Sequence, residues 1–424
     1  MRGTLKTDNG FKRSFCFRRE LDMKKIISVI LCITLICGLG LQGCGNEKTD
    51  GPVTITIWHD KEEKVAKVLE DALSVLEPEI NIVLEKKEGL TDSLKLVGND
   101  PSAAPDIYFF AHDKIGVYAE MGILAPITDF VSEETLSQYM DVTIDATTYK
   151  GVQYQLPIYY ETLLFMYNKE YMSEEEVPAT TEELYTYMQE NTKDGRYGFV
   201  EQHSTAYYSI PWIHGFGGEL IDEEGYPLLT TPQVTDALNY HYKFLEYMPN
   251  ESEYSTVNTL FLEGKADSII GGPWLVPTAR EAGIDLGFAP MPVVDETELT
   301  LAPYTGVQGI HVLKVSAESK SEEITKVLEI LCDPQVGIDM AKVSGCAPAN
   351  TLCYQDEAVA NDELVQTMKT IAEEAVAMPN IPEMDIMFVV AGNLLVSVNM
   401  NDADIEEAAE DNQKKALTLI DAMK

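Results

Sequence analysis

Positive charge is scarce in this chain. It has 31 lysines and arginines against 70 aspartates and glutamates, and its formal net charge at pH 7 is −39. So acidic a chain repels nucleic acid and anionic lipid, which argues against both as partners that it would recognise by charge. The same excess of negative charge favours solubility.

Sequence motifs of metal and nucleophile chemistry are also lacking. GxxxxGK[ST], GxSxG and HExxH do not occur, the histidines are scattered singly, and no two cysteines have CxxC spacing. We therefore expect no metal site and no cofactor. Three cysteines follow residue 44, namely Cys332, Cys346 and Cys353. Their odd number argues against a disulfide framework, although one bridge such as Cys346 to Cys353 stays open.

The longest uncharged run is near the N-terminus. Lys24 and Lys25 precede 16 uncharged residues, 26–41, and then comes Gly43-Cys44. A basic, then apolar, then small-residue pattern is typical of a secretory signal, and the run is short for a membrane span. It resembles a bacterial lipoprotein signal, which predicts lipidation of Cys44. A plain secretion signal and a single membrane anchor are the weaker alternatives.

This signal predicts the processing and location of the chain. We expect translation to start at Met23, residues 1–22 to be untranslated, and 23–43 to be the signal peptide. Residues 44–52 are short and polar, and they read as a tether. The mature protein would be held by lipid on the extracellular face of the membrane, as in Gram-positive bacteria. Without residues 1–43 the chain has 23 basic and 67 acidic residues, a net charge near −44.

Length and periodicity predict an α/β protein with two lobes. About 380 residues follow Cys44, more than one hydrophobic core of about 250–300 residues supports. Residues 53–58 alternate apolar and polar side chains, 61–76 have helical spacing, and 80–84 and 105–110 are strand-like. This β-α-β pattern predicts a parallel sheet with ligand sites at its strand ends.

The later chain continues the alternation of strands and helices. Because no Gly/Ser-rich linker occurs, we expect the chain to cross between lobes on ordered segments that form a hinge. A strand is expected at 162–168, and helices are expected at 232–247, 321–331, 362–377 and 405–423.

Several aromatic residues lie beside polar residues in segments rich in glycine and proline. Sugar rings have apolar faces and polar edges, so aromatic platforms with carboxylates or amides beside them suit a sugar. Each aromatic alone is more readily a core residue. An enzyme would need paired carboxylates, and Asp113 with Glu161 could be posed as a glycosidase pair. The aromatic residues are Trp58, Phe110, Tyr207, Tyr208, Trp274 and Phe388.

Four segments resemble the maltose- and maltodextrin-binding proteins, which are solute-binding proteins of ATP-binding-cassette importers. The order and spacing of the segments fit nearly all of residues 53–424, and the fourth is the most specific. They are Pro105-Asp106-Ile107 with Ala111-His112-Asp113-Lys114, Pro157-Ile158-Tyr159-Tyr160-Glu161 with Tyr167-Asn168-Lys169, Gly272-Pro273-Trp274, and Met378-Pro379-Asn380-Ile381-Pro382-Glu383-Met384.

The resemblance implies a two-lobed periplasmic-binding-protein-like fold of type II with a ligand cleft at the hinge. It places 53–159 plus 309–356 in the N-lobe and 160–308 plus 357–424 in the C-lobe. It implies a monomer that does no chemistry, binds a malto-oligosaccharide and delivers it to permease subunits. A surface glycoside hydrolase, a binding protein for another oligosaccharide and a structural adhesin are the alternatives.

The resemblance also implies the ligand-binding residues. Sugar hydroxyls would be bound by Asp113, Lys114, Glu161 and Tyr207, and sugar rings would stack on Phe110, Trp274 and Phe388. The pair Asp60-Lys61 would contribute from the end of the first strand. The chain departs from the family pattern at five positions, which puts the identity of the sugar in doubt. Lys114 replaces Arg, Phe110 and Phe388 replace Trp, Thr205 replaces Glu, and Gly392 replaces Arg.

Overall fold

The structure, a computed structural model, describes residues 51–423. The predicted start at Met23, the signal peptide, Cys44 and most of the tether lie outside these residues. Contacts group Pro52–Lys424 as one unit, and the fold below is that of this unit.

The larger of two main sheets has eight strands. Its order is β12-β7-β11-β3-β1-β2, and β4 and β13 also pair with β11. β1 is parallel to β2 and β3, whereas β3, β4 and β7 run antiparallel to β11. The strands are β1 (Val53–His59), β2 (Ile80–Lys86), β3 (Ile107–Ala111), β4 (Leu124–Ala125), β7 (Leu156–Thr162), β11 (Tyr304–Leu313), β12 (Ala347–Pro348) and β13 (Val376–Ala377).

The predicted β-α-β unit is present at the start of this sheet. Alternation in β1 points Ile55 and Ile57 into the core, where both are fully buried. The connecting helix α2 (Glu63–Leu73) buries Val65, Leu69 and Leu73, which recur at helical spacing. It is shorter than predicted, because residues 74–76 form a 3-10 turn instead.

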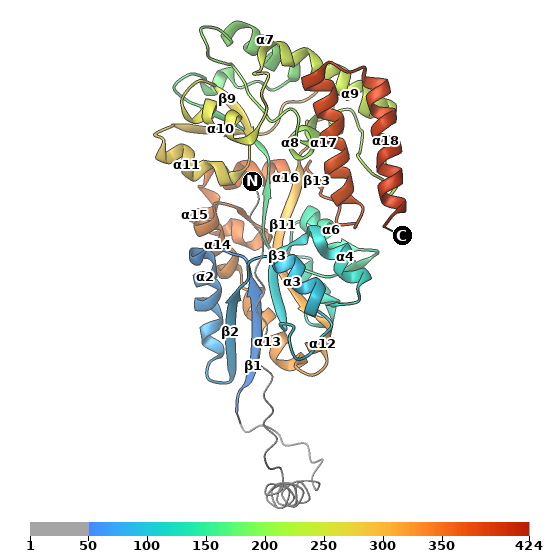
Figure 1. The fold of residues 1–424 in the computed structure, drawn as a ribbon. Coiled ribbons are helices and arrows are strands. Elements are labelled where there is room, and N and C mark those ends of the chain that lie inside the picture. The colour runs from blue at the N-terminus through green and yellow to red at the C-terminus, as the bar shows by residue number, and fades with distance from the viewer. Residues whose placement is uncertain (1–50, 424) are drawn as a thin grey trace, which may run out of the picture. The chain divides into compact units, whose positions relative to one another are not determined.

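A smaller antiparallel sheet organises the other lobe. Its order is β10-β8-β9, built from β8 (Leu164–Asn168), β9 (Ser268–Gly271) and β10 (Leu286–Ala289). We name the two parts the large-sheet lobe and the small-sheet lobe, which lie at the bottom and top of Figure 1. The small-sheet lobe also holds α7 (Thr181–Asn191), α8 (Ala206–His214), α9 (Pro232–Tyr242), α10 (Tyr254–Leu262), α11 (Val276–Glu281), α17 (Met384–Asn401) and α18 (Ile405–Asp421).

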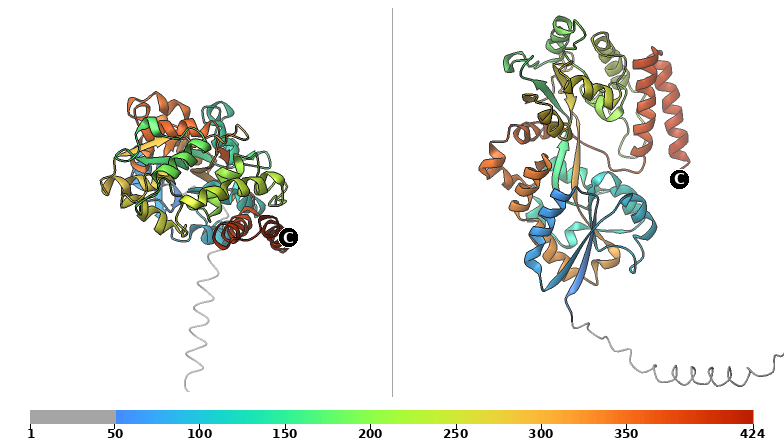
Figure 2. Two further views of the ribbon diagram at one scale, coloured as in Figure 1. Left: turned by 90° about the horizontal axis from the view of Figure 1, so that it is seen from above. Right: turned by 60° about the vertical axis from the view of Figure 1, so that its left-hand side comes forward.

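Short helices and one hairpin complete the large-sheet lobe and its border with the small sheet. Figure 2 shows helices on both sides of the larger sheet, as an α/β architecture requires. They are α3 (Leu90–Val97), α4 (Ile115–Glu120), α5 (Glu133–Leu136), α6 (Asp141–Ala146), α12 (Lys314–Ala317), α13 (Ser321–Leu331), α14 (Pro334–Ser344), α15 (Glu357–Ala360) and α16 (Glu363–Ala372), with the hairpin β5 (Thr148–Tyr149) and β6 (Val152–Gln153).

Ordered segments connect the lobes. β7 ends at Thr162 in the large sheet, and β8 begins at Leu164 in the small one. β11 returns the chain beside β7, pairing over Thr305–Ile310. The residues after β13 form a further connection, because Asn380 donates to the carbonyls of Ala146 and Thr148 before α17 begins. The predicted limits between the lobes, after residues 159 and 308, fall inside β7 and β11, and they stay predictions.

Further sequence predictions need correction at their boundaries. The helix expected over 232–247 ends at Tyr242, and Lys243–Tyr247 is a 3-10 helix. The helix expected over 362–377 ends at Ala372, because Val376–Ala377 leaves it to pair with Tyr304 and Thr305 of β11. The strand expected over 162–168 begins at Leu164, because Thr162 still pairs in β7.

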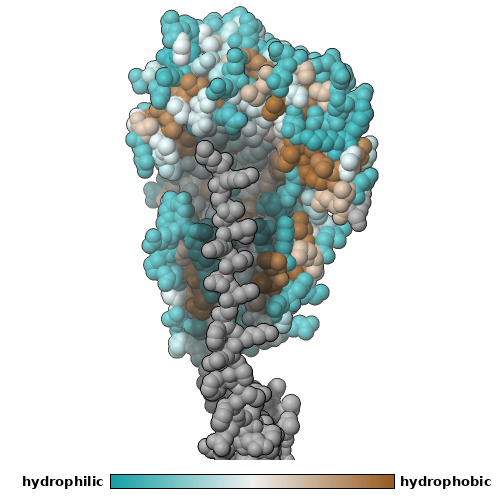
Figure 3. All heavy atoms as spheres, viewed as in Figure 1, coloured by the Kyte–Doolittle hydropathy of each residue, from teal (hydrophilic) through white to brown (hydrophobic). Residues whose placement is uncertain are grey.

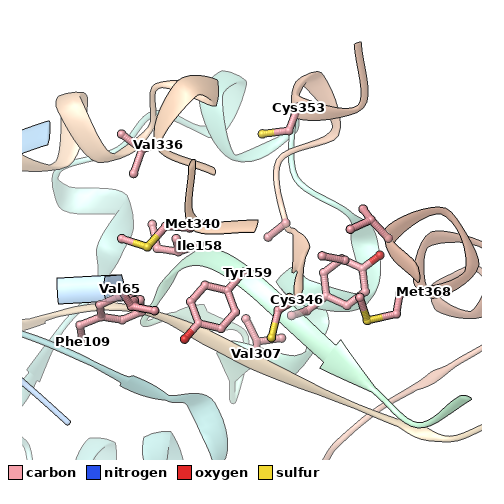
Figure 4. Close-up of a cluster of buried hydrophobic side chains, with 14 of the residues drawn as sticks. Val65, Phe109, Ile158, Tyr159, Val307, Val336, Met340, Cys346, Cys353 and Met368 are labelled. Atoms are coloured by element: carbon pink, nitrogen blue, oxygen red, sulfur yellow. The ribbon is translucent and has the colours of Figure 1, made fainter. Parts of the chain in front are cut away.

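The core clusters are apolar and contain thiols. Figure 4 shows Cys346 and Cys353 among buried side chains that include Tyr159 and Met340. Cys332, Cys346 and Cys353 are all free, so the Cys346–Cys353 bridge left open by the sequence does not form.

One described helix, α17, is long and apolar enough to span a membrane by length and composition alone. Its buried face packs on α8 and α18 through residues such as Met387 and Leu394. Apolar side chains also gather on the surface over α17 in Figure 3, and Val389 is 62% exposed. The contacts with two neighbouring helices make α17 a core element of the small-sheet lobe.

Candidate ligand-binding site

A cavity of about 480 Å³ opens where the two lobes meet. Seven of the nine predicted ligand-binding residues line it: Phe110, Asp113, Lys114, Glu161, Tyr207, Trp274 and Phe388. They come from the end of β3 and the turn after it, from β7, α8 and α17, and from the turn before α11. The remaining lining residues are Thr91, Ala111, His112, Gly306, Val307, Gln308 and Met378.

Trp274 is held at the cavity by the two residues before it. It lies in the 3-10 turn Pro273–Leu275, and its side chain remains 37% exposed. The indole folds back over Gly272, where an added Cβ would lie 2.2 Å from the ring. The ring centroid of Tyr207 is 6.4 Å away at a tilt of 39°. The local sequence thus aims a large apolar face into the cavity.

The other aromatic candidates differ in their surroundings. Phe388 lies on α17 with its ring centroid 6.5 Å from that of Tyr304. Trp58 is only 7% exposed, and its indole N–H donates to Glu85. Trp58 and Tyr208 are absent from the cavity lining, so they have the core role that each aromatic alone suggested.

Asp113 and Lys114 form an ion pair that continues to Asp385 on α17. Both belong to the 3-10 turn His112–Lys114 that follows β3. Lys114 Nζ lies 3.0 Å from Asp113 Oδ2 and 2.5 Å from Asp385 Oδ1 on α17. Burial works to lower the pKa of Lys114, but the charges and hydrogen bonds of the two carboxylates outweigh it and raise that pKa. The carboxylate of Asp113 therefore has a fixed cation beside it.

Glu161 is the most enclosed carboxylate of the lining. It lies on β7 opposite Gly306 of β11. Burial raises the pKa of Glu161, whereas the hydrogen bond from Gln308 and the charge of Lys61 lower it. Cys346 Sγ lies 3.9 Å from Oε2 of the same carboxylate.

Asp60 and Lys61, the two other predicted residues, are outside the cavity lining. The Lys61 side chain is only 8% exposed, and its Nζ lies 2.8 Å from Asp60 Oδ1. It also stands over the rings of Phe109 and Phe110, at 5.0 and 5.7 Å from their centroids. Lys61 contacts one lining residue, Gln308, because its Nζ donates a hydrogen bond to Gln308 Oε1 at 2.6 Å.

Sequence reasoning did not single out His112 or Gln308. His112 is fully buried; its Nδ1 accepts the N–H of Val307 at 3.1 Å, and its Nε2 lies 3.0 Å from the carbonyl of Met378. It thus ties together two of the segments that join the lobes. The Ala-His-Asp motif contained His112, but nothing in the sequence marked β11, which carries Gln308.

Two departures from the family pattern can be located. Thr205 is the N-cap of α8, and its side chain makes no capping hydrogen bond. Gly392 lies inside α17, where an added Cβ would meet only the carbonyl oxygen of Ser204, at 4.0 Å. Within residues 51–423, no cluster of three or more histidine, cysteine or acidic residues could hold a metal ion.

Comparison with known proteins adds sequence relatives. The maltotriose-binding protein of Pyrococcus abyssi is 30% identical over 350 residues, covering 80% of this chain and 75% of that protein. The galactooligosaccharide-binding protein of Bacillus subtilis is 26% identical, covering 92% and 96%. The maltodextrin-binding protein MdxE of Bacillus subtilis is 27% identical, covering 88% and 92%.

Solved structures and a family model agree with these relatives. A cyclo/maltodextrin-binding protein complexed with maltotetraose matches with a TM-score of 0.80 at 26% identity, covering 89% of this chain and all of that one. The maltose/maltodextrin-binding domain of Bdellovibrio bacteriovorus, bound to maltotriose, matches with a TM-score of 0.71 at 25% identity, covering 87% and 100%. The fold is therefore the predicted two-lobed periplasmic-binding-protein type. A family model matches residues 77–367, and the chain belongs to the family that this model describes, the bacterial extracellular solute-binding proteins.

Proposed function

We propose that this protein binds malto-oligosaccharides outside the cell and delivers them to an ATP-binding-cassette importer. The observation that carries the proposal is the cavity between the lobes, which brings three aromatic side chains and two carboxylates together. Glucose rings have apolar CH faces that stack on Phe110, Trp274 and Phe388. Their hydroxyl groups donate to Asp113 and Glu161, and ionised acceptors make the stronger hydrogen bonds.

Closure of the lobes would give the ligand its affinity. Residues from both lobes line the cavity, so a sugar makes its full set of contacts only when the lobes are closed. Differential contact of this kind shifts the protein toward the closed state. The proposal includes the predicted lobe limits, 53–159 plus 309–356 and 160–308 plus 357–424. Structures with and without sugar test them, since each set of residues should move as one body.

The identity of the sugar is tested by calorimetry. The panel is maltose, maltotriose, longer maltodextrins, cyclodextrins and oligosaccharides without α-glucose. A galactooligosaccharide belongs to it as well, because one relative of comparable coverage is named for that sugar. We expect maltotriose or a longer maltodextrin to bind most tightly. Binding of a galactooligosaccharide alone would assign a different sugar to the same site.

We further propose that the protein catalyses no reaction. The family and the relatives named above are solute-binding proteins. The raised pKa of Glu161 is a property that a glycosidase acid also needs, so hydrolysis deserves a direct test. A reducing-sugar assay on maltoheptaose should show no release over the rate of a Glu161→Gln variant. Release that depends on Glu161 would make the protein a hydrolase.

The cellular setting completes the proposal. We expect Cys44 to be lipidated and Met23 to be the start, so that the mature protein is anchored to the outer face of the membrane. A streptococcal relative, 24% identical, is named a solute-binding lipoprotein. Mass spectrometry of membrane-extracted protein would find a modified Cys44 at the N-terminus, and an unmodified Cys44 would refute the anchor. The partners would be the permease subunits, with the protein acting as a monomer.

A further inference from the structure

Gln308 links a buried cation to a half-buried carboxylate at the cavity. Its Oε1 accepts from Lys61 Nζ at 2.6 Å, and its Nε2 donates to Glu161 Oε1 at 3.4 Å. The three side chains come from three separate segments, the residues after β1, the strand β7 and the strand β11. Gln308 also lines the cavity itself.

The backbone fixes where this side chain lies. Gln308 is in the middle of β11, opposite Ala111 of β3 and Tyr159 of β7. The pairing with β7 shifts register between Gln308 and Gly309, and a bulge of this kind re-aims the side chain beside it. Gly309 permits the close approach, because an added Cβ would lie 2.3 Å from the carbonyl oxygen of Leu156.

The chemistry of the neighbours fixes the orientation of the amide. An ammonium group only donates hydrogen bonds, and an ionised carboxylate only accepts them. The amide oxygen must therefore face Lys61 and the amide nitrogen must face Glu161. The opposite orientation would set donor against donor and acceptor against acceptor.

The same arrangement keeps Lys61 from pairing directly with Glu161. The ammonium group of Lys61 pairs with Asp60, 2.8 Å away, and donates a hydrogen bond to the amide oxygen of Gln308. Glu161 receives the amide on Oε1 and the Cys346 thiol near Oε2. Each carboxylate oxygen has two acceptor positions, so Glu161 keeps acceptor capacity for a ligand hydroxyl.

We infer that Gln308 is a positioning residue of the sugar site, which holds Glu161 in place as a free, ionised acceptor. This inference rests on the proposed function and deepens it. The removal of the amide lets Glu161 take up a proton more readily, because a donor that favours its ionised form is gone. A protonated carboxyl group is a poorer acceptor for the sugar than an ionised one.

The test is a double-mutant cycle in maltotriose affinity. Gln308→Met keeps the length of the side chain and removes both hydrogen bonds. We expect Gln308→Met to weaken binding about tenfold, and Glu161→Gln to weaken it by roughly ten- to a hundredfold. In the Glu161→Gln background, Gln308→Met should cost less than about twofold, because its effect acts through the carboxylate. Equal losses in both backgrounds would overturn the inference.

The pH dependence of sugar affinity distinguishes this positioning role from a purely structural role of Gln308, because a purely structural loss would be the same at each pH. The ratio of wild-type to Gln308→Met affinity should be larger at pH 5.5 than at pH 7.5, since the variant carboxylate protonates more readily. A ratio independent of pH would contradict the inference. Gln413→Leu is the control, because Gln413 is a buried amide that accepts from the N–H of Leu229, and neither residue lines the cavity. It should lower stability and leave affinity unchanged.

A ligand-free arm separates this inference from the proposed function. The same four proteins are unfolded with denaturant in the absence of sugar. Non-additive losses of stability support the link between Gln308 and Glu161 even if the wild type binds no sugar, in which case only the proposed function fails. Additive losses together with normal sugar binding in Gln308→Met would leave the function standing and overturn the positioning role.

Discussion

Buried histidines without a carboxylate partner make the stability of this fold sensitive to acid. His311 is fully buried, stacks on Tyr108 with ring centroids 4.2 Å apart, and lies 3.2 Å from the amide nitrogen of Gln155. Burial lowers the pKa of His311 to about 3 and also lowers that of His112. The side chain of His311 is therefore neutral in the folded protein at pH 5.5, where an unfolded chain would protonate it.

We predict that wild-type stability falls as the pH drops below about 6.5. The unfolded histidine binds a proton first, so each such residue costs up to about 1.4 kcal/mol per pH unit until its folded pKa is reached. His311→Gln removes one of these residues and should show a shallower fall. Denaturant unfolding at pH 7.5, 6.5 and 5.5 measures the two slopes. Parallel curves for the two proteins would show that His311 does not titrate in this way.

Trp274 and Trp212 should separate binding from stability. Trp274 is 37% exposed at the cavity, whereas Trp212 is 2% exposed and donates to the carboxylate of Glu201. Trp274→Ala should weaken maltotriose binding about tenfold or more by removing a platform, with little change in melting temperature. Trp212→Ala should cost about 3–5 kcal/mol of stability. If Trp274→Ala lowers the melting temperature and leaves affinity intact, Trp274 is a core residue.

Single residues of the site were predictable only where a motif or a resemblance marked them. Asp113, Trp274 and Phe388 lie in segments with recognisable neighbours, and they line the cavity, while their binding of a sugar stays a prediction. Gln308 has no such mark, because a glutamine between Val307 and Gly309 says nothing of the charges that the fold brings to it. Lys61 was predicted to contact the ligand; its ammonium group contacts Gln308 and Asp60, and its role in binding stays a prediction.

At the scale of the elements, periodic segments were predictable and uniformly buried ones were not. β1 and α2 show clean periods of 2 and 3.6, because each has one buried face. β11 is buried along nearly its whole length, so it has no alternation of polar and apolar residues. α17 is apolar on most sides and has exposed valines, so its buried stripe does not stand out in the sequence.

Two glycines in helices should respond oppositely to the same substitution. Gly392→Ala should stabilise the protein by about 0.5–1 kcal/mol, because alanine favours α17 and its Cβ meets only Ser204, at 4.0 Å. Gly116→Ala should destabilise it, because a Cβ on α4 would lie 2.4 Å from the carbonyl oxygen of Asn380, which accepts the Gly116 N–H. Thermal unfolding of both variants measures the contrast. A loss of stability in Gly392→Ala would mean that α17 has no room there.

At the scale of the whole described unit, the lobes are joined by the chain and also by contacts across the cavity. Lys114 follows β3 in the large-sheet lobe, and Asp385 lies in the first turn of α17 in the small-sheet lobe, with 2.5 Å between Nζ and Oδ1. Lys114 lines the cavity, so the contact joins the two lobes beside it. Because the Asp385 side chain is 55% exposed, water and salt screen the pair, and we expect it to contribute no more than about 0.2–1 kcal/mol.

The Lys114–Asp385 pair predicts that the ligand-free protein favours closed lobes at low salt and loses this preference at high salt. Asp385→Asn should shift the ligand-free protein toward a larger radius of gyration in solution scattering at low salt, and the difference from wild type should shrink at about 1 M salt, where the Debye length is roughly 3 Å. With saturating maltotriose the two proteins should scatter alike, since the sugar contacts outweigh one screened pair.

Asp339→Asn is the matched control, because Asp339 pairs with Lys342 inside α14 and does not join the two lobes. An Asp385→Asn protein that matches wild type at every salt concentration, without sugar, would show that closure does not depend on this pair.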